Sequence, residues 1–89
     1  MARLLSFVNI FVESPLMGHV LEELEKLPNT EQLYEVTGDF DITCVLSTVD
    51  VDEFRDILVN RIMKIKGVRS TVTALVLHSH EISRGASGA

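Results

Sequence analysis

The segment Leu4–Val12 is apolar on both of its alternating faces, and this constrains the fold more than any other feature of the chain. It is rich in Val, Ile, Phe and Leu, which indicates a β-strand. One face carries Leu5, Phe7, Asn9 and Phe11, and the other carries Leu4, Ser6, Val8, Ile10 and Val12. Because apolar side chains on both faces need cover, we expect a sheet that is buried on both sides.

The small size of the chain limits how much apolar surface it can bury by itself. Its 89 residues make one small domain, and a domain of this size buries only about 60–65% of its unfolded surface. Yet 46% of the residues are hydrophobic and the mean hydropathy is +0.25. We therefore expect part of the apolar surface to be buried between subunits.

Composition excludes several classes of protein. No apolar run approaches the roughly 18–20 residues of a membrane span, and the first residues lack the pattern of a signal peptide. The net charge of −5 argues against direct binding of nucleic acid. A single cysteine, Cys44, fits a reducing cytoplasm. Residues 81–89 end in small and polar side chains, so we expect a disordered C-terminal tail.

Two helices are predicted from capping signals and apolar stripes. Ser14 is a candidate N-cap with Pro15 at the first helical position, and Asp50 with Glu53 forms a D-x-x-E capping pattern. Gly67 is expected to end the second helix. The core stripes are Leu16, Val20, Leu21, Leu24 and Leu27 in the first helix, and Phe54, Ile57, Leu58, Ile62 and Ile65 in the second.

Three further strands are predicted over residues 30–36, 41–48 and 71–77. The order is therefore β-α-β-β-α-β, the ferredoxin-like arrangement of an α+β protein. Its four-stranded antiparallel sheet carries both helices on one face, which leaves the second apolar face open. We expect a homodimer to cover that face, with larger rings as an extension of it.

The turn at residues 36–41, V-T-G-D-F-D, is the main candidate for a ligand site. Gly38 accepts a positive φ and leaves nearby backbone N–H groups accessible. Asp39 and Asp41 are close enough in sequence to face one ligand amine. A plain solvent-exposed hairpin turn uses the same residue types, and this alternative stays open.

Evidence for catalysis in the sequence is thin. His78 and His80 lie on one face of a strand, but two ligands do not make a metal site. Cys44 lies among apolar residues, as a buried and unreactive thiol does. No G-x-S-x-G, P-loop or H-E-x-x-H motif is present. We therefore predict no enzymatic activity, no cofactor and no metal.

The motifs together resemble a known family over residues 4–78. The specific parts are V-T-G-x-x-D at residues 36–41 and G-V-R-x-T-x-T at residues 67–73; L-E-K-L-P at 24–28 and V-D-E-F at 51–54 accompany them. The chain resembles the ligand-binding (RAM) domain of Lrp/AsnC-type regulators, which we place at residues 1–80.

The resemblance implies a function. Such domains dimerise through their sheets, often assemble into octamers, and bind a small effector, usually an amino acid, between dimers. Asp39 or Asp41 would accept from the effector's ammonium group, while the backbone near Gly38 and the Thr71 hydroxyl would donate to its carboxylate. The effector-site residues that the resemblance implies are Thr37, Gly38, Asp39, Phe40, Asp41, Thr71 and Thr73.

The chain also departs from the family. Full-length members carry an N-terminal helix-turn-helix domain, whereas here the first strand starts within a few residues of Met1. We therefore expect a stand-alone RAM protein that senses an amino acid, co-assembles with full-length regulators, or does both. Two alternatives stay open: a small dimeric ferredoxin-like enzyme of the isomerase or monooxygenase type, and a structural partner that binds no ligand.

Overall fold

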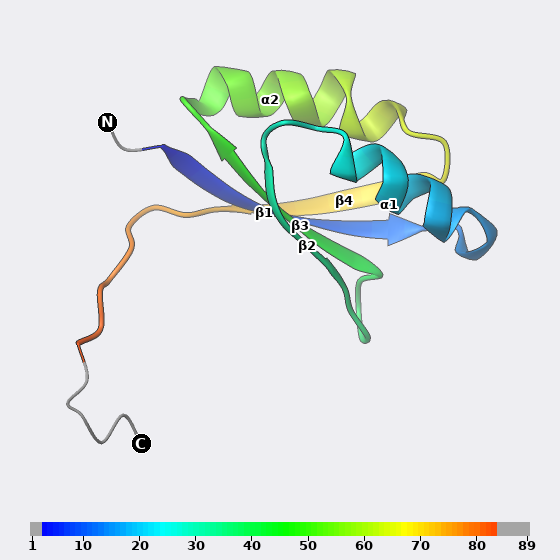
Figure 1. The fold of residues 1–89 in the computed structure, drawn as a ribbon, viewed down its shortest axis with the longest axis horizontal. Helices are drawn as coiled ribbons and strands as arrows, with labels where there is room; N and C mark the ends of the chain where they lie inside the picture. The colour runs from blue at the N-terminus through cyan, green and yellow to red at the C-terminus, as the bar shows by residue number, and fades with distance from the viewer. Residues whose placement is uncertain (1–2, 84–89) are drawn as a thin grey trace.

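The computed structural model describes residues 3–83 and has the predicted β-α-β-β-α-β order (Figure 1). The four strands form one antiparallel sheet in the order β2-β3-β1-β4, and both helices cover the same face. The elements are β1 (Leu4–Val12), η1 (Ser14–Leu16), α1 (Met17–Glu25), β2 (Thr30–Glu35), β3 (Ile42–Thr48), α2 (Val51–Asn60), η2 (Ile62–Lys64) and β4 (Val68–Leu75).

The core lies between the sheet and the helices, and the predicted stripes form it. Val8 and Ile10 of β1 are fully buried there. The side chains from α1, α2 and the turns that follow them are Val20, Leu24, Leu27, Phe54, Ile57 and Ile62, with Leu21, Leu58 and Ile65 packed at the margin. The predicted stripes form this core with the exception of Leu16, which lies outside it. The second helix is shorter than predicted, because α2 ends at Asn60 and a separate turn, η2, carries Ile62; Gly67 therefore does not end that helix.

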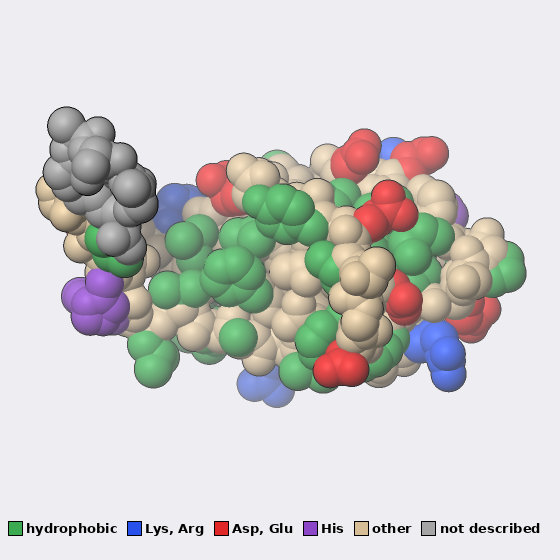
Figure 2. Space-filling model, turned by 90° about the horizontal axis from the view of Figure 1, so that it is seen from below, with side chains coloured by type: hydrophobic (Ala, Val, Ile, Leu, Met, Phe, Trp, Pro, Cys, Tyr) green, Lys and Arg blue, Asp and Glu red, His purple; other side chains and the backbone are tan. Residues whose placement is uncertain are grey.

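The other side of the sheet, called the open face below, has no cover in a single chain. Its register rows contain Leu5, Phe7, Asn9, Phe11, Tyr34, Thr43, Val45, Val72 and Ala74. Phe7 is 40% exposed and Val72 52% exposed, although both lie within the sheet. Figure 2 shows this face from below, with hydrophobic side chains gathered over its middle. The sheet is thus apolar on both sides, as predicted.

The start of the first helix differs from the prediction. Ser14 is not an N-cap, because Ser14–Leu16 form a 3₁₀ turn closed by the bond from Leu16 N–H to the Glu13 carbonyl (2.8 Å), and α1 begins only at Met17. Pro15 does lie in the first turn, where its missing N–H costs nothing. At α2 the prediction is confirmed, since Asp50 Oδ1 accepts from Glu53 N–H at 2.8 Å.

The last strand is shifted toward the N-terminus relative to its predicted range. β4 covers Val68–Leu75 because Val68 already pairs with Val12 at the end of β1. The bond from Val76 N–H to the Leu5 carbonyl (2.9 Å) is the last one to β1, and beyond it the chain leaves the sheet.

Within residues 3–83, no helix is long and apolar enough to cross a membrane. Of the tail expected at 81–89, residues 81–83 are in neither helix nor strand, and residues 84–89 lie outside the described part of the chain.

Candidate functional site

The β2–β3 turn has an open backbone at its tip. The bond from Val36 N–H to the Asp41 carbonyl (3.0 Å) closes the turn. Gly38 has φ +111°, which confirms the expected positive φ, and a Cβ added there would meet nothing within 4 Å. Thr37, Gly38 and Asp39 are all exposed. The tip therefore offers backbone groups and a carboxylate to a partner from outside the chain.

Asp41 differs from Asp39 because the fold already uses its carboxylate. Its Oδ2 accepts from Val12 N–H at 2.7 Å, and its own N–H donates to the Ile10 carbonyl at 3.0 Å. These bonds hold the end of β1 at the point where the β1–β4 register shifts. Asp39 makes no side-chain hydrogen bond or ion pair within residues 3–83, so it is the better acceptor for a ligand.

Phe40 fixes the turn against the first strand. Its ring meets the Phe11 ring edge-on, with centroids 5.1 Å apart and planes at 66°. Such aromatic pairs add about 0.5–1.5 kcal/mol beyond the burial of their surface. This contact anchors the turn beside the open face.

The two threonines lie on the opposite side of the sheet. Thr71 pairs with Ile10 and Thr73 with Val8, so both face the helices. Thr71 is half-buried; the Thr73 hydroxyl is fully buried and has no hydrogen-bond partner in the described part of the chain. The seven expected site residues therefore lie toward one end of the sheet, but a single chain does not bring them to one surface.

The candidates for catalysis and metal binding are Cys44, His78 and His80, which lie in two separate parts of the fold. Cys44 is buried in the core, as predicted, and burial raises the pKa of its thiol to about 11, so it is protonated at neutral pH. The prediction that His78 and His80 share a strand face is wrong, because β4 ends at Leu75; both lie beyond it, exposed, with ring centroids 4.6 Å apart. Residues 3–83 hold no group of three or more His, Cys, Asp or Glu side chains placed to bind a metal.

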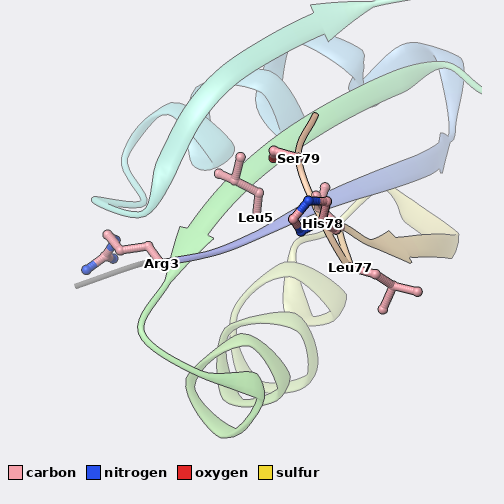
Figure 3. A pocket seen from close by; sticks show the side chains of 6 residues that line it. Arg3, Leu5, Leu77, His78 and Ser79 are labelled. Atoms are coloured by element: carbon pink, nitrogen blue, oxygen red, sulfur yellow. The ribbon is translucent and has the colours of Figure 1, made fainter. Parts of the chain in front are cut away.

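Sequence reasoning missed a cavity at the other end of the sheet. It has a volume of about 260 Å³ and is lined by Arg3, Leu5, Val76, Leu77, His78 and Ser79 (Figure 3). No motif spacing links position 3 with position 78, because the cavity depends on where the chain leaves β4. It lies away from the turn at residues 36–41.

The two aspartates predict different effects on stability. We expect Asp41→Ala to lower the free energy of unfolding by about 1–3 kcal/mol, since Val12 N–H loses its partner. Asp39→Ala should change it by less than about 0.5 kcal/mol, as exposed substitutions usually do. Asp41→Asn keeps an acceptor oxygen and should fall between them. Urea denaturation of the three variants checks this order, and equal stabilities for Asp39→Ala and Asp41→Ala would contradict it.

Comparison with known proteins matches the chain to one family and to transcriptional regulators. The Lrp/AsnC ligand binding domain family matches residues 5–85. The helix-turn-helix-type transcriptional regulator FL11 of Pyrococcus furiosus is 32% identical over 79 residues, covering 89% of this chain and 52% of that protein. The chain spans about half the length of the curated relatives it matches.

Solved structures share the fold. Protein TTHA0845 of Thermus thermophilus is 26% identical with a TM-score of 0.85, over 89% of this chain and 99% of that one. A transcriptional regulator from Neisseria meningitidis, solved as a complex with L-Met, has a TM-score of 0.83 at 16% identity, over 90% of this chain and 53% of that one. The match over residues 5–85 shows that this chain belongs to the Lrp/AsnC ligand-binding domain family.

Proposed function

We propose that this chain is a non-enzymatic regulatory module that binds an amino acid where copies of it meet. The exposed tip of the turn carries the proposal: Gly38 with φ +111° and open space around it, next to the unpaired Asp39. Asp39 accepts from the effector's ammonium group, and backbone N–H groups near Gly38 donate to its carboxylate. The L-Met complex of the Neisseria regulator supports this class of ligand.

The open face supports the assembly part of the proposal. Phe7, Val72 and Tyr34 are 40–52% exposed on this face, an arrangement that a monomer rarely tolerates over a contiguous patch. Pairing two open faces buries these side chains in a sheet-on-sheet interface. The turn at residues 36–41, which contacts Phe11 through Phe40, then lies at the margin of the interface. Neighbouring dimers supply the remaining pocket walls there, and Thr71 or Thr73 would contribute to the site through such a neighbour.

Binding at such a seam couples the effector to assembly. A ligand that binds one oligomer better than another shifts the population toward the better binder. In the cytoplasm this coupling would modulate transcription or amino-acid metabolism through co-assembly with helix-turn-helix regulators related to those it matches. Residues 1–80 form the effector-binding unit in this proposal, and the chain does not bind DNA itself.

Isothermal titration of the protein against the twenty amino acids tests the effector. We expect saturable heat with at least one of them, and at least a tenfold loss of affinity in Asp39→Asn because a charge-assisted bond is removed. Glu25→Gln, an exposed acid on α1, is the matched control and should bind like the wild type. Silence across the panel, or equal affinity in Asp39→Asn, would contradict the site. Capture of a helix-turn-helix protein without any ligand would favour a structural partner instead.

A further inference from the structure

A polar pair, Asn9 of β1 and Thr43 of β3, lies within the open face. Asn9 lies opposite Thr43 in the register of β1 with β3, and opposite Val72 in the register of β1 with β4. Phe7 and Phe11 come before and after Asn9 on the same face of β1, because side chains two residues apart share a face of a strand. The amide therefore lies among apolar neighbours, on the side of the sheet that Figure 2 shows from below.

Thr43 holds the Asn9 amide in one orientation. Thr43 Oγ1 donates to Asn9 Oδ1 at 2.7 Å. That bond uses one of the two acceptor positions of the amide oxygen, so a second position is free. Asn9 Nδ2 makes no hydrogen bond to any group within residues 3–83, and Asn9 is half-buried, so water reaches its two N–H groups in the single chain.

A second copy that covers the open face takes these two N–H groups away from water. A buried donor without an acceptor lowers an association constant by roughly five- to a hundredfold. The apolar neighbours Phe7, Phe11 and Val72 have no acceptor in their side chains. The face of the second copy carries the same groups, and its Asn9 amide oxygen has a free acceptor position. The open face is therefore complementary to itself at Asn9.

We propose that Asn9 fixes the register of the open-face dimer by pairing with Asn9 of the second copy. A primary amide is both donor and acceptor, so two amides related by a two-fold axis form two reciprocal Nδ2–H···Oδ1 bonds. A sheet displaced from this position would leave both amides unpaired against apolar side chains, which disfavours the wrong registers. The proposal rests on the open-face dimer proposed above, and it adds that the two-fold axis of that dimer passes beside Asn9.

Mixing two charge variants, followed by native mass spectrometry, tests whether the side chains at position 9 meet. Asn9→Asp alone and Asn9→Lys alone should each be monomeric at concentrations where the wild type is dimeric, because like charges would face each other across the axis. Mixed in equal amounts, the two variants should form a heterodimer. Its dissociation constant should lie at least about a hundredfold below that of either variant alone.

Tyr34→Lys mixed with Asn9→Asp is the matched control. Tyr34 is 49% exposed and lies opposite Thr43, in the same register row as Asn9 but two strands away, at about 10 Å. This mixture should give no heterodimer. A dimeric wild type whose Asn9→Asp and Asn9→Lys variants do not combine would overturn the pairing at Asn9 while leaving the dimer itself in place. A monomeric wild type would instead overturn the assembly under the proposed function, and the pairing with it.

Two neutral variants test what the amide contributes. Thr43→Val removes the hydroxyl that orients Asn9 and should weaken the dimer about two- to tenfold, whereas Thr43→Ser keeps the hydroxyl and should restore wild-type affinity. Asn9→Leu should associate at least as tightly as the wild type but in more than one register. In ¹⁵N–¹H NMR spectra the wild type should then give one set of amide signals for β1, and Asn9→Leu more than one. A single set in Asn9→Leu would contradict the role in register.

Discussion

Phe7→Asp is expected to convert the assembled protein into folded monomers. Phe7 is central on the open face, between Val45 and Ala74, and is 40% exposed in the single chain. In the paired assembly an aspartate there would be a buried, unpaired charge, which costs about 3–5 kcal/mol. The dimer dissociation constant should therefore rise by roughly a hundred- to a thousandfold or more.

Sedimentation velocity across a concentration series measures this change directly. Val59→Asp is the matched control, because Val59 is 44% exposed on the outer side of α2, away from the open face. It should leave the assembly intact. Circular dichroism of Phe7→Asp should still show the native helix content. A wild-type protein that is monomeric at working concentration, or an unchanged assembly in Phe7→Asp, would remove the proposed interface and the seam in which the effector binds.

Much of the fold could be predicted from the sequence because local signals and burial agree there. Leu4–Val12 is rich in Val, Ile, Phe and Leu, which predicts β1, and the Asp50–Glu53 cap predicts the start of α2. The errors occur where the pairing partner decides. β4 starts at Val68 because Val12 is opposite it, and Ser14 enters a 3₁₀ turn because the chain must bend sharply after β1.

The candidate site was harder to predict, since it depends on contacts between distant positions. Two aspartates two residues apart look equivalent in sequence, yet only Asp41 meets Val12 N–H, 29 positions away. The alternation of side chains along the strand puts Thr71 and Thr73 on one face, but it does not show whether that face lies against the helices or on the open face. The cavity at Arg3 requires the path of the chain after Val76, for which the sequence has no local signal.

Gly67→Ala is expected to be the most destabilising single-methyl change in the fold. Gly67 has φ +107°, and a Cβ there would lie 2.7 Å from Leu16 Cβ and 2.9 Å from Val20 Cγ2. The backbone strain and the forced shift of α1 should together lower the free energy of unfolding by roughly 3–5 kcal/mol. For a domain of this size that corresponds to a fall in Tm of about 15 °C or more. The Gly67 carbonyl also accepts from Glu13 N–H at 2.9 Å, so the same shift would loosen the β1–η1 junction.

Two other glycines distinguish the effect of backbone strain from that of steric contact. Gly38→Ala has the same backbone strain, at φ +111°, but open space around the added methyl, so it should lose only about 1–2 kcal/mol. Gly18→Ala in α1 has neither strain nor contact and should gain about 0.5–1 kcal/mol from helix propensity. Thermal denaturation of the three variants at one protein concentration gives the comparison. Equal losses of stability in Gly67→Ala and Gly38→Ala would show that contact of the added methyl with Leu16 and Val20 contributes nothing beyond the backbone strain.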